Sequence, residues 1–340
     1  MTIPADKQSA VARALVAAFG TSELDGPPVV LSGGLSGASL YRIRVGGIGY
    51  VLRLETAVSP FGPQGRVRTY ACMRAAAEAM IAPRVWHTDA EAGVTIIDLV
   101  AQVPLSDYPG DGMLIELAQT LRALHAVPAF PEAVDFLDGV EGLIATYRAQ
   151  ALLDPAAGEP VFTRFAGLRA SYRPRPQDLV ASHNDLNPAN ILYDGRRLWL
   201  IDWEVAFRAD RFLDLAATAN WFLDDTAGET RLLASYLGAA PSAEQRARLR
   251  LMRLANHVYY GVVFLIGAVG ERPDVKLQDR SLDGPALAEL RQGLKRGTFE
   301  IARWENRVTY GKARLAAALH GFQGSFARDL DLCAEPAAAA

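Results

Sequence analysis

The segment 181–206, ASHNDLNPANILYDGRRLWLIDWEVA, places acids and amides between apolar runs. Four residues separate His183-x-Asp185 from Asn190, and Asp202 lies near the end of the second of two short apolar runs. These runs, NILYD and RLWLIDW, predict two strands joined by a tight turn, which would bring Asn190 and Asp202 side by side. Buried carboxylates are costly unless a positive group lies among them. An amide oxygen and a carboxylate that converge in this way form a hard oxygen site that suits Mg²⁺.

The spacing is that of the catalytic loop of protein-kinase-like phosphotransferases, in which one Asp orients the hydroxyl and an Asn and a second Asp bind Mg²⁺. HNDLNPANIL followed by LIDWE resembles more specifically the aminoglycoside phosphotransferase and choline/ethanolamine kinase superfamily. The resemblance implies that Asp185 acts on the substrate hydroxyl and that Asn190 and Asp202 hold Mg²⁺. His183 belongs to the same motif, where we expect it to brace the loop by hydrogen bonding. The alternative is a chance acidic loop between two strands.

The flanking sequence predicts an α+β chain. Residues 1–100 contain an amphipathic helix, β-rich runs separated by glycine pairs, and one further helix that stops at Pro83;. We therefore expect a small antiparallel sheet lobe over 1–100 and a mainly helical lobe over 101–330, followed by a tail over 331–340. Helices are predicted around 113–127, 138–152, 158–170, 212–223, 228–238, 242–269 and 283–317. The resemblance implies a protein-kinase-like two-lobed fold, with the nucleotide on the sheet lobe and the catalytic loop and substrate pocket in the helical lobe.

The run LSGGLSGASLYRIRV resembles the nucleotide loop of the family. Glycines there let the backbone approach phosphate oxygens, and serines add donors. The residues expected to bind ATP in this loop are Gly33, Gly34, Ser36, Gly37 and Ser39. Arg53, in VLRLE, lies where kinases carry the strand residue that contacts the ATP phosphates. The alternatives are a plain turn for the loop and an exposed strand arginine for Arg53.

One landmark of the family is missing. Related kinases carry a helix Glu that pairs with the phosphate-contacting Lys or Arg, and its position falls near Thr69, which cannot form an ion pair. Arg53 is then expected to find another partner, such as Glu55 or a loop carboxylate. The same departure supports a different function, that of a pseudokinase that binds nucleotide without turnover.

The resemblance also bears on the acceptor. Choline kinases hold a quaternary ammonium with aromatic faces and a carboxylate, because a weakly hydrated cation favours such contacts. IDWEVAFRADRFLDLAATANWF and NHVYYGVVFLIG look like the choline-kinase versions of these segments, which makes Glu204, Trp221 and Tyr260 candidate substrate residues. We expect ATP-dependent phosphorylation of an amino alcohol such as choline or ethanolamine. The alternative in the same class is an aminoglycoside or other hydroxylated-metabolite phosphotransferase.

Composition narrows the remaining classes. The 340 residues are half hydrophobic and carry a formal net charge of −3, with scattered arginines, which argues against nucleic acid as a partner;. The two cysteines, Cys72 and Cys333, favour a reduced, cytoplasmic compartment over a disulfide framework;. The sequence contains no uninterrupted apolar run of about 18 residues, so it predicts no membrane span. The expected partner is a small-molecule hydroxyl acceptor, and the oligomeric state stays open.

Overall fold

The computed structural model describes residues 3–31, 38–55, 62–110, 112–131, 135–150, 152–223 and 225–334. An antiparallel sheet near the N-terminus and a mostly helical remainder confirm the predicted α+β class. By contacts, the chain forms two compact units, Met1–Pro131 with Val180–Arg208 and Glu132–Leu179 with Ala209–Ala340. This division differs from the lobes 1–100 and 101–330, which stay a prediction.

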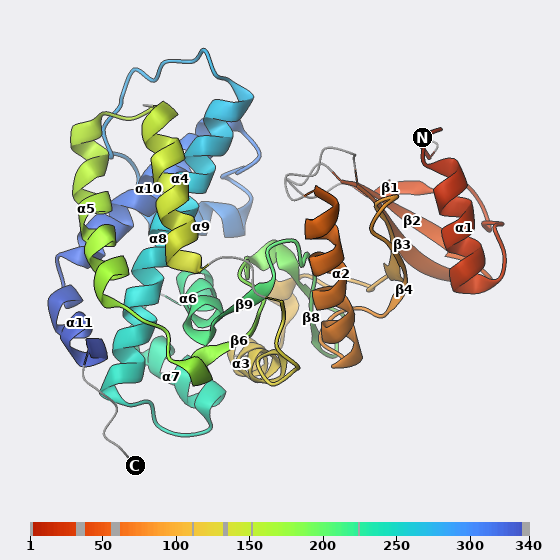
Figure 1. Ribbon diagram of the computed structural model, residues 1–340, viewed down its shortest axis with the longest axis horizontal. Helices are drawn as coiled ribbons and strands as arrows, with labels where there is room; N and C mark the ends of the chain where they lie inside the picture. Colours follow the sequence, from red (N-terminus) through yellow and green to blue (C-terminus); the bar gives the residue numbers. More distant parts are fainter. Residues whose placement is uncertain are drawn as a thin grey trace. The chain divides into compact units, whose positions relative to one another are not determined.

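The first unit is built on a five-stranded sheet (Figure 1). Its strands, in spatial order, are β1 (Val29–Leu31), β2 (Ser39–Val45), β3 (Ile48–Leu54), β5 (Val94–Asp98) and β4 (Val85–Asp89), and all pairs are antiparallel. Gly46 and Gly47 connect β2 to β3 with positive φ values of 58° and 81°. Two consecutive positive φ values are what a two-residue hairpin turn needs, so the glycine pair was a reliable predictor of this hairpin.

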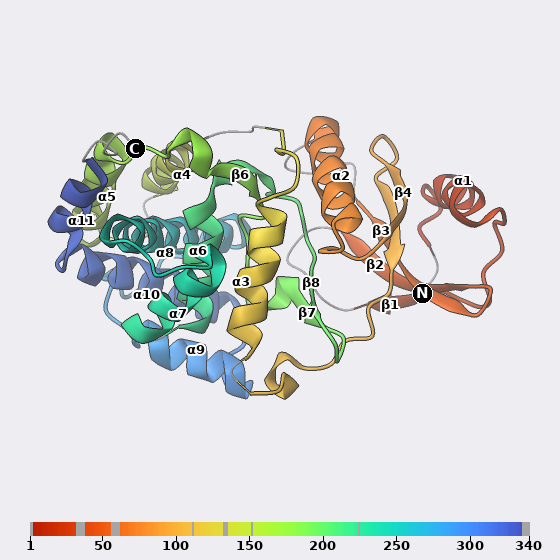
Figure 2. The same ribbon diagram turned by 90° about the horizontal axis from the view of Figure 1, so that it is seen from below.

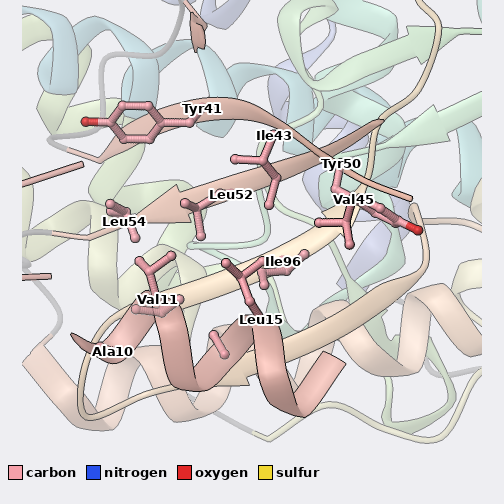
Figure 3. Packing of buried hydrophobic residues seen from close by; sticks show 12 residues of the cluster. Ala10, Val11, Leu15, Tyr41, Ile43, Val45, Tyr50, Leu52, Leu54 and Ile96 are labelled. Atoms are coloured by element: carbon pink, nitrogen blue, oxygen red, sulfur yellow. The ribbon is translucent and has the colours of Figure 1, made fainter. Parts of the chain in front are cut away.

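Helix α1 (Gln8–Phe19) covers one face of this sheet (Figure 3). Its Val11 and Leu15 point at Leu52 and other apolar side chains that alternate along β2 and β3. Burial of one such aliphatic side chain stabilises the fold by about 1.5–3 kcal/mol relative to exposure. Because side chains alternate along a strand, Arg53 of β3 projects from the opposite face;.

That opposite face is the side of the sheet on which α2 (Gly62–Glu78) lies (Figures 1 and 2). Buried Arg66 anchors α2 to the sheet, because its Nε donates to the main-chain oxygen of Ala90 at 2.6 Å. The unit also contains η1 (Leu105–Asp107), α3 (Gly112–Leu124), η3 (Pro188–Asn190) and the hairpin of β7 (Ile191–Tyr193) and β8 (Leu198–Leu200). This hairpin turns at Gly195, as the sequence predicts.

The second unit is helical. Its elements are α4 (Phe136–Gln150), α5 (Pro155–Ser171), η2 (Pro176–Asp178), α6 (Arg211–Phe222), α7 (Thr226–Leu237), α8 (Ala243–Glu271), α9 (Leu287–Arg296), α10 (Trp304–Phe322) and α11 (Phe326–Ala334). Strands β6 (Leu179–Ser182) and β9 (Phe207–Asp210) form a separate two-stranded sheet. Helix α8 is central, since it packs against α4, α6, α10 and α11.

Helix α8 is also the one helix of the described residues that is long and apolar enough to cross a membrane. Of its most apolar window, 56% is buried inside the protein, which is typical of a core helix. Cys72 and Cys333 are free thiols. The cytoplasmic location stays a prediction.

Two segments differ from the sequence expectation. The helix predicted over 283–317 is divided into α9 and α10, because Gly297 adopts a left-handed φ of 70° and caps α9. Such a residue ends a helix even where the apolar periodicity continues beyond it. Helix α11 continues to Ala334, so the first four residues of the predicted tail 331–340 are helical.

A buried acid at the start of α6 predicts how stability depends on pH. Asp210 caps α6 by accepting from the Phe212 N–H at 2.9 Å, and its Oδ2 accepts from the Tyr172 hydroxyl at 2.5 Å. Burial raises the pKa of Asp210 to about 6. A carboxyl whose folded pKa is raised stabilises the fold at pH values below its unfolded pKa, and this contribution is lost as pH rises through about 6;.

We therefore expect the wild type to lose stability between pH 4 and pH 7 relative to Asp210→Asn, which has no proton to release. A shift of about two pKa units corresponds to on the order of 3 kcal/mol. Urea denaturation across this pH range measures the difference in slope, and Asp138→Asn, at an exposed ion pair with Arg169, is the control. Parallel slopes for wild type and Asp210→Asn would show that Asp210 titrates normally.

Candidate active site

The loop that carries Asp185 is held by amide hydrogen bonds. Asp185 Oδ2 accepts from Asn187 Nδ2 at 3.1 Å and from Asn190 Nδ2 at 3.0 Å, and the Asp185 main-chain oxygen accepts from the same Asn190 nitrogen at 2.8 Å. Asn187 caps η3 by accepting from the Ala189 N–H at 2.9 Å, with Pro188 in the first helical position;. This short helix therefore fixes the spacing between Asp185 and Asn190.

His183 links the same loop to the strand that precedes Asp202. The ring is fully buried; its Nδ1 accepts from the Asp185 N–H at 3.3 Å, and its Nε2 donates to the main-chain oxygen of Ile201 at 2.8 Å. The ring also lies 4.6 Å from that of Trp203. Both ring nitrogens are hydrogen-bonded to main-chain atoms, as expected of a residue that braces the loop.

Asn190 and Asp202 are brought together by the backbone. The Ile201 N–H donates to the main-chain oxygen of Asn190 at 3.0 Å. Asp202 directly follows Ile201 in the chain, so this hydrogen bond places it beside Asn190. Asn190 uses its amide nitrogen in both bonds to Asp185. Its amide oxygen, the atom that would bind a metal, accepts no hydrogen bond from the described residues.

These residues fit Mg²⁺ better than a metal that needs a full protein cage. Within the described ranges, no group of three or more His, Cys, Asp and Glu side chains is placed to hold a metal ion. Mg²⁺ is usually bound by one or two protein oxygens together with water and substrate phosphates. One amide oxygen and one carboxylate beside it match that requirement.

Arg53 meets three carboxylates. Its Nη1 donates to Asp202 Oδ1 at 3.3 Å, its Nη2 forms an ion pair with Glu204, and its Nε lies 3.6 Å from Glu55 Oε1. The expectation that Arg53 finds Glu55 or a loop carboxylate is confirmed. Thr69 is buried in α2.

The predicted nucleotide loop lies only partly within the described residues. Gly33, Gly34, Ser36 and Gly37 lie outside the described residues. Ser39 opens β2 opposite Leu54, whereas Leu40 lies opposite Arg53. Directly paired residues share a face of the sheet, so the register does not bring the Ser39 hydroxyl to the Arg53 side.

The predicted aromatic residues of the second unit lie together, but around a cation of the protein itself. The rings of Trp221 and Tyr260 are 6.2 Å apart. The guanidinium carbon of fully buried Arg314 lies 4.7 Å from the ring centre of Trp221, 5.2 Å from that of Tyr260 and 5.1 Å from that of Tyr310. These distances are those of cation–π contacts.

Arg314 is fixed by neutral partners. Its Nη2 donates to the Tyr310 hydroxyl at 2.7 Å, and its Nη1 donates to Nδ1 of His257 at 3.2 Å. Burial, and then the positive charge of Arg314, hold the pKa of His257 well below its usual range, so the imidazole is neutral and can accept. Sequence reasoning missed Arg314; the signal was its position one helical turn after Tyr310;.

Comparison with known proteins identifies a family and a related enzyme. The family model described as Phosphotransferase enzyme family matches residues 29–251. The thiamine kinase of Salmonella paratyphi B is 32% identical over 178 residues, which cover 52% of this chain and 59% of the relative. The chain is thus matched to little more than half the length of that relative.

Two solved structures share the fold along almost the whole chain. A choline/ethanolamine kinase family protein from Mesorhizobium loti has a TM-score of 0.70 at 20% identity and covers 96% of this chain and 99% of its own. A choline kinase from Cryptosporidium parvum has a TM-score of 0.67 at 12% identity, with 96% and 98% covered. The predicted protein-kinase-like fold is thereby confirmed.

Proposed function

Because the chain belongs to the phosphotransferase enzyme family, we propose that it transfers the γ-phosphoryl group of ATP to an alcohol hydroxyl of a small molecule. The observation that carries this proposal is the arrangement of Asp185, Asn190 and Asp202, in which a carboxylate and a metal-binding amide are tied to each other and the second carboxylate is adjacent. Phosphoryl transfer asks the protein mainly for positioning and charge stabilisation.

Each side chain then has a defined task. Asp185 orients the acceptor hydroxyl and takes its proton, while His183 holds the loop. Asn190 and Asp202 hold Mg²⁺, which supplies neutralising charge at the phosphates when bound. Arg53 contacts the phosphates, together with the loop that contains Gly33, Gly34, Ser36 and Gly37.

The surroundings of Trp221 and Tyr260 restrict how a cationic acceptor can be bound. An amino alcohol such as choline or ethanolamine is the acceptor that the sequence favours, and the thiamine kinase relative adds thiamine. A quaternary ammonium on the rings of Trp221 and Tyr260 would have to share them with Arg314, and like charges at such distances repel;. Any cationic acceptor is therefore held by other groups, and aminoglycosides and other hydroxylated metabolites remain alternatives.

The pseudokinase alternative is weakened by the surroundings of Arg53. Its sequence support was the absence of a helix Glu near Thr69. The structure supplies carboxylate partners to Arg53 by another route.

The proposal is tested by Mg²⁺-dependent ATP consumption with choline, ethanolamine, thiamine, sugars and aminoglycosides as acceptors. We expect one acceptor to stimulate turnover by the wild type, and no acceptor to stimulate the Asp185→Asn variant. ATP binding without stimulation by any acceptor, over the whole panel, would instead favour the pseudokinase. Stimulation of both proteins alike would show that the activity does not come from this site.

A further inference from the structure

Helix α2 carries no carboxylate where Arg53 needs one. Its single acidic residue, Glu78, is its last residue and is exposed. Thr69, at the position expected for the acid, cannot carry charge. Yet Arg53 contacts Glu204, Asp202 and Glu55.

The segment that supplies Glu204 is held firmly by its neighbours. Arg68 of α2 donates to the main-chain oxygen of Glu204 at 2.7 Å, and Asn184 of the catalytic loop donates to the main-chain oxygen of Val205 at 2.9 Å. The preceding residue, Trp203, is buried against His183 and Phe130. Helix α2 thus still controls a carboxylate, but through a bond to the backbone of another segment.

The charges around Arg53 explain why a second acid is useful beside Asp202. Arg53 contacts Glu55 and Glu204 as well as Asp202, the proposed metal ligand. A guanidinium that pairs with Asp202 alone would compete with Mg²⁺ for that carboxylate. Glu204 pairs with the Nη2 side of the guanidinium, so Asp202 is contacted by Nη1 and shares the charge of Arg53 with a second acid.

Glu55 is less suited to this task. It is buried, lies farther from the guanidinium, and accepts a hydrogen bond from the Tyr70 hydroxyl at 3.2 Å. Burial raises the pKa of Tyr70 to about 12, so the hydroxyl keeps its proton and remains a donor to Glu55.

We propose that Glu204 is a positioning residue that replaces the missing helix carboxylate, holding Arg53 for the ATP phosphates and limiting its contact with Asp202 to Nη1. This inference rests on the proposed function, because it assumes that Arg53 meets ATP and Asp202 meets Mg²⁺. It gives Glu204 a role distinct from contact with the acceptor.

The test compares Glu204→Gln with Glu204→Asp, and with Glu78→Gln as the control that removes the only acid of α2. Calorimetry measures ATP binding over a range of Mg²⁺ concentrations, and steady-state kinetics gives the KM values for ATP and acceptor. For Glu204→Gln we expect the Mg²⁺ concentration at half-maximal ATP binding, and the KM for ATP, to rise about 10–100-fold. Glu204→Asp should recover part of this loss, the KM for the acceptor should not change, and Glu78→Gln should match the wild type.

The same substitution made in the Arg53→Met variant tests whether the effect of Glu204 passes through Arg53. If Glu204 acts through Arg53, Glu204→Gln adds little further loss of ATP binding to Arg53→Met, since coupled residues are not additive. Full additivity, or a rise confined to the acceptor KM, would overturn the proposal. The calorimetric readout needs no turnover, so a wild type that binds Mg²⁺–ATP without phosphorylating any acceptor would refute the proposed function alone. A wild type that does not bind Mg²⁺–ATP would refute both.

Discussion

Asp185→Asn is expected to lower kcat by roughly 10²–10⁴-fold, the range typical of removing a general base. The change keeps the shape of the side chain, and the amide oxygen of the new Asn can still accept from Asn190, so the loop should keep its form. What disappears is the negative charge that orients the acceptor hydroxyl and takes its proton. Binding of Mg²⁺–ATP should be almost unchanged, because the metal ligands and Arg53 are untouched.

The control for Asp185→Asn is the same substitution at an acid that also accepts several hydrogen bonds in a turn but has no proposed role in the reaction. Asp194 lies in the turn between β7 and β8, where it accepts from the Arg196 and Arg197 N–H groups and from Trp199 Nε1. Asp194→Asn should leave kcat near the wild-type value, although it weakens the turn. Single-turnover measurements with saturating acceptor separate chemistry from binding. Near-normal turnover by Asp185→Asn would show that another group orients the hydroxyl.

The arrangement of His183, Asp185, Asn190 and Asp202 in the candidate site could be predicted from the sequence because its geometry is local. The spacing between His183, Asp185 and Asn190 is set by one short helical turn, and Asp202 is brought back by a hairpin of two short strands. Residues so near in sequence leave few ways to arrange them. The alternation of apolar residues along β2 and β3 is likewise local, so the sheet and its helices followed from periodicity.

Contacts between segments that are far apart in the chain could not be predicted from the sequence in the same way. Arg53 and Asp202 are 149 residues apart in the chain, and Arg68 and Glu204 are 136 apart. The resemblance to the family implied that Arg53 needs a carboxylate partner, but it did not show that Arg68 would hold the segment that provides Glu204. The same limit applied to Arg314. A helical arginine usually predicts an exposed side chain, and only the tertiary packing of α6, α8 and α10 shows that aromatic rings enclose it;.

The second large effect is expected from Asp202→Asn, which should weaken Mg²⁺–ATP binding by more than about 10²-fold, beyond the loss typical of a residue that only supports a ligand. Asp202 has a left-handed φ of 66°, a conformation that Asn tolerates far better than Ala;. The change therefore removes a charge without straining the backbone. Because the metal is needed for both binding and transfer, kcat should fall as well, which separates this variant from Asp185→Asn.

The decisive measurement is ATP binding with and without Mg²⁺. In the wild type, Arg53 divides its hydrogen bonds and ion pairs between Asp202 and Glu204. When the charge of Asp202 is removed, Arg53 is attracted less strongly to that side and keeps its charge for the phosphates. Metal-free ATP should then bind the variant at least as tightly as the wild type, while the gain produced by Mg²⁺ disappears. If Mg²⁺ still strengthened ATP binding to the wild-type extent, the metal would be held by residues other than Asp202. Weaker metal-free binding would mean instead that Asp202 holds Arg53 in place for the phosphates.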